Sequence, residues 1–309
     1  MTRANTTQSA KREILRRRLD FEFDAKAVPK DWYSGDLHLT LFWDGLSLLF
    51  PKGEQFFVNS VKHYSKPKHG ESRIKDPVLQ DQIAGFIGQE SMHGKEHRAF
   101  NEMLLAHGLD NAPQLEAEVA ALLNRAQRKL PPIIKLAVTC ALEHFTAILA
   151  EQLLESDRHR AAIHESVRDL WVWHAMEESE HKSVAFDAFQ AVGGTYPIRV
   201  GTMLVTSIIF VVVASEVHIR LSYRAGEVFK PRRWLSNLNF FWGKPGLFRK
   251  LLVPYLDYFR PGFHPSDRDT EGLLAEWDAK LFGEEGTLLG VLKGAYDASG
   301  QLVSAPAPT

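Results

Sequence analysis

Two Glu-x-x-His motifs constrain the fold of this chain more than any other feature of its sequence. The two motifs are Glu90-x-x-His93 and Glu178-x-x-His181. Residues three apart share one face of a helix, so each motif directs a carboxylate and an imidazole towards the same point. A further glutamate precedes each motif at nearly the same distance: Glu54 lies 36 residues before Glu90, and Glu143 lies 35 residues before Glu178. Four helices that hold two metal ions in a bundle use this order of glutamates and histidines.

The surroundings of these residues strengthen the prediction. The motif alone is weak, because 22 glutamates and 13 histidines in 309 residues predict about one Glu-x-x-His by chance. Glu54 and Glu143, however, both lie in apolar sequence, with Phe56 and Phe57 after the first and Phe145 after the second. A carboxylate on an apolar helix face is costly unless it is paired or bound to metal. We therefore expect all six side chains to point into the bundle.

Helix-ending residues divide the chain and predict an all-α fold. Asp76 and Pro77 are typical of a helix start and Gly108 of a helix stop, so a helix is expected over 77–107. The other helices expected before residue 195 cover 41–64, 112–130, 132–156 and 160–192. Pro51 is expected to kink or divide the first of them. No stretch before residue 195 alternates apolar and polar residues between hairpin turns, which argues against a sheet.

These helices predict a ferritin-like four-helix bundle with additional C-terminal helices. In this topology the 112–130 helix is the long crossover between two helical hairpins. The expected segments are an N-terminal segment over 1–35, the two-metal bundle over 36–194, a C-terminal helical extension over 195–300 and a disordered tail over 301–309.

Residues 200–217 form a strongly apolar stretch, with Glu216 as its one charged residue. Its length is at the lower limit for a membrane span, and basic and aromatic residues follow it up to residue 250. Two alternatives stay open: a helix buried within the domain, or a helix that contacts a membrane surface through 200–250. A second copy of the chain, in a homodimer, is a further candidate partner.

Composition excludes several classes of function. The net charge is −1, so no basic field attracts nucleic acid. The one cysteine, Cys140, leaves no cysteine-based zinc or iron–sulfur site and fits a reducing compartment. No apolar run follows the basic N-terminal residues before Asp20. We therefore expect a cytoplasmic protein, peripheral to the inner face of the membrane if 200–250 binds lipid.

Two more histidines extend the candidate site. His174 precedes Glu178 by four residues on the same helix face, so it is either an additional ligand or a residue that orients one, and we place it among the ligands. His97 follows His93 by four residues, and we expect it to orient a ligand or to face substrate. Helix registry does not firmly exclude Glu177. The candidate metal ligands are Glu54, Glu90, His93, Glu143, His174, Glu178 and His181, and the candidate catalytic residues are Glu96 and His97.

Three stretches that carry these residues resemble a known family. They are Leu48-Leu49-Phe50-Pro51-x-Gly53-Glu54, Gln89-Glu90-x-x-His93-x-x-Glu96-His97 and Trp173-His174-x-x-Glu177-Glu178-x-Glu180-His181. Together they look like the bacterial family described as predicted metal-dependent hydrolases, related to the ferritin-like superfamily. The resemblance implies a metal-dependent enzyme. The spacing of His174, Glu178 and His181 also resembles di-iron arylamine N-oxygenases, in which the extra histidine binds one iron.

We consider three functions. A di-iron oxidase or oxygenase, with dioxygen and a small apolar molecule as substrates, uses the whole ligand set, and manganese or an iron/manganese pair would also suit the site. A zinc hydrolase is the main alternative, because His93-x-x-Glu96-His97 matches the inverted zincin motif, in which two histidines bind zinc and the glutamate activates water. A non-catalytic iron-binding protein is the third, since the same bundle serves that purpose.

Overall fold

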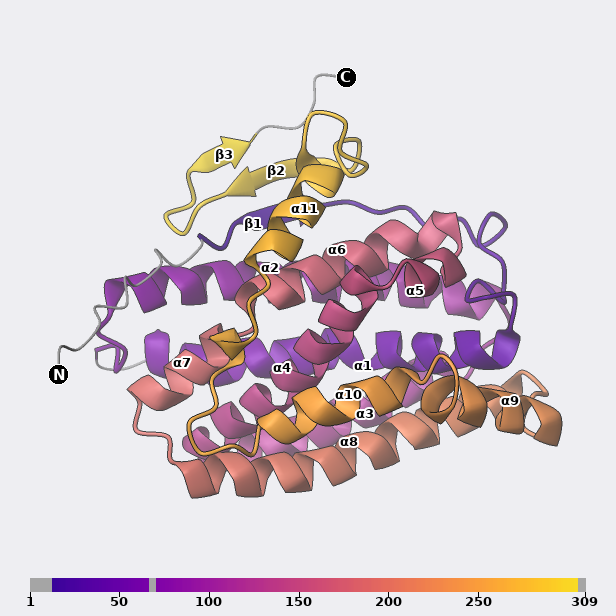
Figure 1. The fold of residues 1–309 in the computed structure, drawn as a ribbon, viewed down its shortest axis with the longest axis horizontal. Helices are drawn as coiled ribbons and strands as arrows, with labels where there is room; N and C mark the ends of the chain where they lie inside the picture. The colour runs from indigo at the N-terminus through magenta and orange to yellow at the C-terminus, as the bar shows by residue number, and fades with distance from the viewer. Residues whose placement is uncertain (1–12, 67–70, 305–309) are drawn as a thin grey trace, which may run out of the picture.

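The computed structural model describes residues 13–66 and 71–304, and these form a helical bundle. Its main helices are α1 (Leu37–Ser65), α2 (Pro77–Ala106), α3 (Ala112–Lys129), α4 (Pro132–Glu155), α6 (Glu165–His181) and α8 (Tyr196–Arg224). Figure 1 shows α1 and α4 between two outer layers, with α2 and α6 on one side and α3 and α8 on the other. The all-α prediction is confirmed.

Most of the predicted helix boundaries lie within a few residues of the observed ones. Asp76 caps α2, because its side chain accepts a hydrogen bond from the backbone N–H of Val78. Asp36 caps α1 in the same way, through the N–H of Leu39. Pro51 does not divide α1, which runs through it for 29 residues. The bundle therefore has one long helix where the sequence left a break possible.

The prediction of a single helix over 160–192 is wrong. The chain instead forms α5 (Asp157–Ala162), α6 and α7 (Val184–Ala191). The side chain of His164 caps α6 by accepting a hydrogen bond from Ser166 N, and Ile163 pairs with Tyr33 in an isolated β-bridge. A histidine cap and a tertiary contact are not local stop signals of the kind that glycine and proline provide.

A small antiparallel sheet joins the two ends of the described chain, and the sequence did not predict it. β1 (Arg16–Leu19) pairs with β2 (Leu292–Tyr296), which pairs with β3 (Leu302–Ser304). Strands this short carry almost no alternation by which to recognise them. Residues 302–304 were expected in the disordered tail and are a strand, while 305–309 lie outside the described residues.

β1 lies directly against α2, and two glycines of α2 permit this contact. A Cβ atom on Gly85 would lie 2.4 Å from the backbone oxygen of Ile14, and one on Gly88 would lie 2.3 Å from the side chain of Arg16. A larger residue at Gly85 would require Ile14 to move, and one at Gly88 would require the side chain of Arg16 to move. The N-terminal segment is thereby held close to the helices that carry the Glu-x-x-His motifs.

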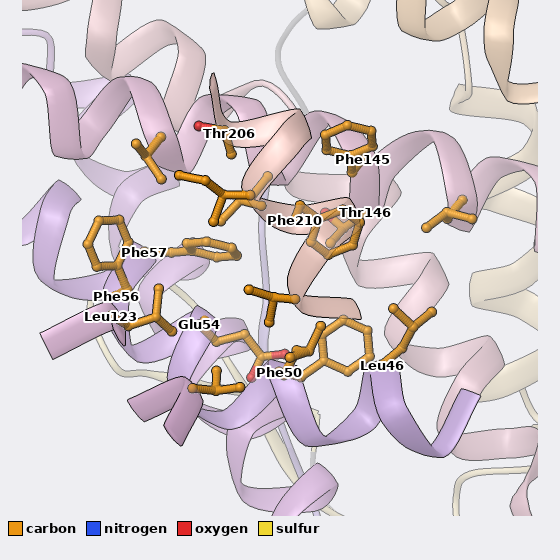
Figure 2. Close-up of a pocket in the computed structure, with 18 of the residues that line it drawn as sticks. Leu46, Phe50, Glu54, Phe56, Phe57, Leu123, Phe145, Thr146, Thr206 and Phe210 are labelled. Carbon is orange, nitrogen blue, oxygen red and sulfur yellow. The ribbon is translucent and has the colours of Figure 1, made fainter. Parts of the chain in front are cut away.

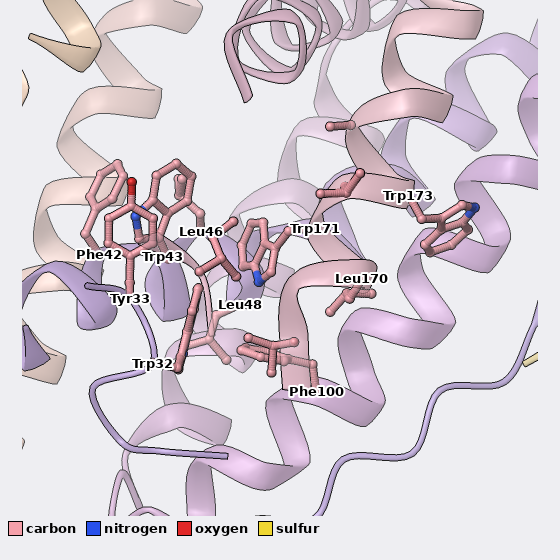
Figure 3. Packing of buried hydrophobic residues seen from close by; sticks show 14 of the residues in the cluster. Trp32, Tyr33, Phe42, Trp43, Leu46, Leu48, Phe100, Leu170, Trp171 and Trp173 are labelled. Atoms are coloured by element: carbon pink, nitrogen blue, oxygen red, sulfur yellow. The ribbon is translucent and has the colours of Figure 1, made fainter. Parts of the chain in front are cut away.

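An aromatic cluster fills the core beside α1, α2 and α6. The ring of Trp171 stacks on Trp32 with centroids 5.7 Å apart, and Trp43 meets it edge-on at 5.5 Å. Figure 3 shows Phe100 beside these tryptophans. The other side of Trp171 faces His97, at 5.4 Å between ring centroids. The hydrophobic core thus forms one wall of the candidate site.

The remaining helices pack around the main helices and add buried residues to their hydrophobic core. They are α9 (Pro231–Trp242), α10 (Leu247–Asp257), the 3-10 turn η1 (Pro265–Asp267) and α11 (Glu271–Phe282). By length and composition, α4 and α8 are each apolar enough to cross a membrane. In α4, 61% of the apolar window is buried, as expected for a core helix, whereas in α8 only 22% is buried. The alternative in which 200–217 is buried within the domain is therefore wrong.

Candidate metal centre

All seven predicted ligands lie together inside the bundle. They form two groups of potential ligand atoms. The pocket-facing group is Glu54, His93 and His174, and the enclosed group is Glu90, Glu143, Glu178 and His181. Within each group, the atoms lie within 4.8 Å of one another. Helices α1, α2, α4 and α6 supply these residues, none of which is more than 4% exposed.

The carboxylate of Glu178 joins the two groups. Its Oε1 atom lies 2.9 Å from His174 Nε2 and 3.6 Å from His93 Nδ1. Its Oε2 atom lies 3.5 Å from His181 Nε2. One oxygen therefore faces each group, so this carboxylate could bridge two ions if each group held one.

The site buries polar atoms that form no hydrogen bond with another described residue. These atoms are both carboxylate oxygens of Glu54, Glu90 and Glu143, together with Glu178 Oε2, His93 Nδ1 and His181 Nε2. Burying such atoms without a partner is strongly unfavourable. All of them are oxygen or imidazole nitrogen atoms, which are the donors that first-row transition metals accept. The residues present therefore fit one or two metal ions.

Burial and close neighbouring charges shift the pKa values of the carboxyl groups in the site. Burial and the neighbouring Glu90 carboxylate raise the pKa of Glu54 well above its usual value. Burial and the same carboxylate also raise the pKa of Glu143. Burial raises the pKa of Glu178 too, but the adjacent His181 and His174 outweigh it and hold this pKa well below its usual value. Without a cation, this dry space cannot hold all of its carboxylates ionised.

Hydrogen bonds behind His181 leave its Nε2 atom free for a metal. Its Nδ1–H donates to Gln89 Oε1 over 2.8 Å. The amide of Gln89 is fixed in this orientation, because its Nε2 donates to the backbone oxygen of Leu15 and to Glu180. The Nε2 atom of His181 then faces Glu90 Oε1 at 3.0 Å. This arrangement sets the tautomer that a metal ligand needs.

His93 is oriented by a carboxylate that belongs to neither group. Its Nε2–H donates to Glu177 Oε2 over 3.1 Å, which leaves Nδ1 facing Glu178. Arg17 of β1 holds Glu177 in turn, at 3.0 Å, and also binds Glu180. Glu177, which helix registry could not exclude as a ligand, therefore positions one. Arg17 gave no signal in the sequence, since 160 residues separate it from its partner.

His174 is oriented by a chain of hydrogen bonds that passes through His97. Asn101 Nδ2 donates to the backbone oxygen of Ser47, so Asn101 Oδ1 is free to accept from the Ser47 hydroxyl at 2.6 Å. The hydroxyl accepts from His97 Nδ1–H at 2.8 Å, and His97 Nε2 accepts from His174 Nδ1–H at 2.7 Å. Each proton position follows from the one before, and the last gives His174 Nε2, which lies 2.9 Å from Glu178 Oε1, a lone pair that a metal could take. His97 thus contacts a ligand rather than lying among the two ligand groups.

Glu96, the other candidate catalytic residue, is bonded to the N-terminal side of the site. Its Oε2 atom accepts from the backbone N–H of Phe21 at 2.9 Å, and its Oε1 atom accepts from Lys95 at 2.7 Å. Neither metal-ligand group includes it among the described residues. Its hydrogen bonds tie α2 to the segment that precedes α1.

A cavity of about 500 Å³ leads to the pocket-facing group. Glu54, His174 and Glu178 line it together with many apolar residues from α1, α3, α4 and α8. Figure 2 shows Glu54 and Phe50 on one side of this pocket and Thr206 and Phe145 on the other. The ring of Phe50 also packs against His174, at 4.7 Å between centroids. The candidate metal centre therefore lies at the base of an apolar pocket.

The fold and these buried groups define a helical-bundle protein with a candidate metal site. The family model described as predicted metal-dependent hydrolase matches residues 15–269, and the chain belongs to this family. All the candidate ligands lie within the matched residues. No curated protein and no solved structure matches the chain, so the likeness to ferritin-like proteins and to N-oxygenases stays a prediction.

Proposed function

We propose that this chain is an enzyme with a two-iron centre that oxidises an apolar substrate, with dioxygen as the oxidant. The observation that carries the proposal is the placement of the pocket-facing group. Potential ligand atoms for two ions converge in the bundle, and three of the residues that supply them also line the apolar pocket. A storage or sensing protein has no need of such a pocket beside its metal, so we favour catalysis over non-catalytic iron binding.

The donor set favours iron among the metals that the site fits. It consists of four carboxylates and three imidazoles, with no thiolate. This mixture suits iron or manganese, and carboxylates bridge such ions readily. An iron pair, when bound, supplies redox chemistry with dioxygen that no side chain of the chain provides.

The chain's own residues have three tasks in this proposal. The pocket binds the substrate and excludes bulk water, because apolar side chains dominate its lining. Glu177, Gln89 and His97 orient the three imidazoles by accepting their N–H groups. Glu178 faces both groups and holds their separation. None of these tasks needs the side chain of Glu96.

Hydrolysis is the second candidate, because the family description names it. The mononuclear zinc form of this alternative uses Glu96 to activate water. Both Glu96 oxygens accept hydrogen bonds, and Glu96 is not among the residues that line the pocket, so this form has less support than hydrolysis at the paired site. Glu96→Gln separates the two: we expect the metal content and activity to persist, whereas a zincin would lose activity and keep its zinc.

The deciding experiment measures metal content and the response to oxygen on the same protein. We expect about two irons per chain after expression in iron-supplemented cells, with a visible absorption that changes on reduction and again on exposure to air. One zinc per chain with no response to oxygen would overturn the proposal. Two redox-inactive ions would favour hydrolysis at the paired site.

A further inference from the structure

Helices α8, α9 and α10 expose a broad apolar surface, which we call the α8–α10 face. Six residues that represent it are Ile208, Val211 and Val212 of α8, Leu235 and Leu238 of α9 and Val253 of α10, each between 57% and 72% exposed. Single exposed apolar residues are ordinary, but a contiguous set of this kind marks a surface that binds something. Figure 1 shows α8 along one long side of the bundle, with α10 beside it.

The charge around the α8–α10 face is positive. Residues 196–257 contain nine basic and three acidic residues, an excess of six positive charges in a chain whose net charge is −1. The three acids already have intrachain partners, in the pairs Glu216–Arg220, Glu227–Lys230 and Asp257–Arg260. By contrast, Arg232, Lys244, Arg249 and Lys250 are exposed and form no ion pair with another described residue. The face therefore offers unpaired cations beside apolar side chains.

The pocket and the α8–α10 face share residues. Val205 and Ile209 line the pocket and are 57% and 47% exposed. Leu122 of α3 also lines the pocket and is 42% exposed. The apolar space that begins at the candidate metal centre thus reaches the outside between α3 and α8. An apolar substrate could pass from this surface to the metals without crossing bulk water.

We propose that the α8–α10 face docks on an anionic lipid bilayer, and that the pocket takes an acyl-chain-like substrate from that bilayer. α8 packs along α1 and α4, so it would lie in the plane of the interface rather than cross the membrane. Anionic headgroups complement the unpaired cations. A second copy of the chain would bring the same cations and no unpaired acid from its own face. The substrate part of this inference rests on the proposed function, but the docking part does not.

Vesicle flotation of the full chain tests the docking. We expect the protein to float with vesicles that contain about 30 mol % phosphatidylserine, to float less with phosphatidylcholine alone, and to be released by about 0.5 M salt. Failure of the protein to float with either kind of vesicle would overturn the inference. So would a dimer in solution that Val211→Glu dissociates, because a second copy would then be the occupant of the face.

Matched variants locate the contact. Val211→Glu on α8 should lower the bound fraction about tenfold, while Val78→Glu on α2, at a site 51% exposed, should bind like the unmodified chain. The double variant Arg249→Ala and Lys250→Ala should weaken binding about thirtyfold, and Lys26→Ala with Lys30→Ala should not. Equal losses in the test and control variants would contradict the assignment. Far-UV circular dichroism checks that each variant is folded.

Membrane docking and the proposed function can be tested separately, because different variants affect each of them. Glu143→Ala should lose metal and still float with vesicles, because Glu143 lies in the core and not on the α8–α10 face. Thr206→Trp should fill the pocket beside α8 and keep both metal content and vesicle binding. It should abolish any oxygen consumption that vesicles stimulate. If that consumption persists, the substrate does not reach the metals by this pocket, even where docking itself is confirmed.

Discussion

The two ligand groups differ in what surrounds them. The pocket-facing group has two imidazoles and one carboxylate, and Glu54 and His174 are part of the pocket lining. In the enclosed group, only the shared Glu178 lines that pocket among the described residues. Glu90, Glu143 and His181 are shielded by the bundle core, where Phe86 packs against His181 at 5.0 Å. An ion in the pocket-facing group would therefore be accessible to substrate, and an ion in the enclosed group would be shielded from it.

This difference shows how a repeated motif can produce unequal halves. The sequence spacing is nearly twofold, with 36 residues between Glu54 and Glu90 and 35 between Glu143 and Glu178. The extra histidine at 174 and the pocket both lie at the pocket-facing group, which takes residues from both sequence halves. The nearly equal spacing thus predicts the six side chains that the two halves have in common, while the neighbours of the two ligand groups decide which group the pocket reaches.

The largest effect is expected from the residue that both groups share. Glu178→Ala should reduce metal content from about two ions to near zero, because each group loses a ligand at once. Metal-loaded protein should then lose about 4 kcal/mol of stability for each ion that had been held at a thousandfold excess over its Kd, or roughly 10 °C in Tm. Elemental analysis and calorimetry check this. Retention of both ions would show that Glu178 does not bridge.

Single histidine variants should separate the two positions. His174→Ala is expected to leave about one ion, held in the enclosed group, and to abolish oxygen reactivity. His181→Ala is expected to leave one ion in the pocket-facing group, so that small exogenous ligands such as azide still change its spectrum. If both variants gave the same spectrum and the same reactivity, the two ligand groups would not differ in their access to the pocket.

The metal-free protein should lose stability as pH rises above about 4.5, the usual pKa of a glutamate side chain. Burial and neighbouring carboxylates raise the pKa values of Glu54 and Glu143, so the folded state holds protons that the unfolded state has released. Stability therefore falls with rising pH, by about 1.4 kcal/mol per pH unit for each proton that only the folded state retains. The lowered pKa of buried His93 acts only below about pH 6.5. Denaturant titrations at several pH values measure the slope.

Metal reverses this trend, because it replaces the protons. Metal binding at pH 7 should release protons, and metal affinity should rise with pH. Calorimetry in buffers of different ionisation enthalpy gives the number released. A metal-free protein whose stability is flat or rising above pH 7 would show that the carboxylates are already ionised.

A smaller effect is expected from the residues that orient the imidazoles. His97→Gln should weaken the pocket-facing ion about 10- to 100-fold, and Gln89→Leu should do the same to the enclosed ion. His144→Gln is the control: His144 is buried and bonded to the backbone oxygen of Pro254, so its loss should cost stability without changing metal affinity. Competition with a chromophoric chelator measures each affinity. If one variant weakened the binding of both ions equally, His97 and Gln89 would not each act on a separate ligand group.

The sequence predicted well that these seven side chains come together, because the positions of side chains on a helix obey local geometry. A carboxylate and an imidazole three residues apart must share a face, and Glu178 and His181 lie as that rule requires. Helix starts such as Asp76 are also local, since a side chain bonds the N–H of a residue two positions on.

What the sequence did not predict depends on contacts between distant residues. Arg17 reaches Glu177 across 160 residues, and β1 pairs with β2 across the whole described chain. The chain from His174 through His97 to Ser47 joins three helices, so no single helix pattern contains it. The exposure of α8 is also a tertiary property, because an apolar helix of its length fits either a core or a surface.

The position of Arg17 has a consequence for the order of events during synthesis. Arg17 belongs to β1, which is paired with β2 and lies next to the α11 residue Asp278. The last ligand, His181, is made 111 residues before β2 begins at Leu292. At ribosomal speed this interval is about 5 to 20 seconds. During it the helices that carry the candidate ligands exist without the β1–β2 pairing, so the surroundings of Arg17 and Glu177 are complete only after the C-terminal hairpin has emerged.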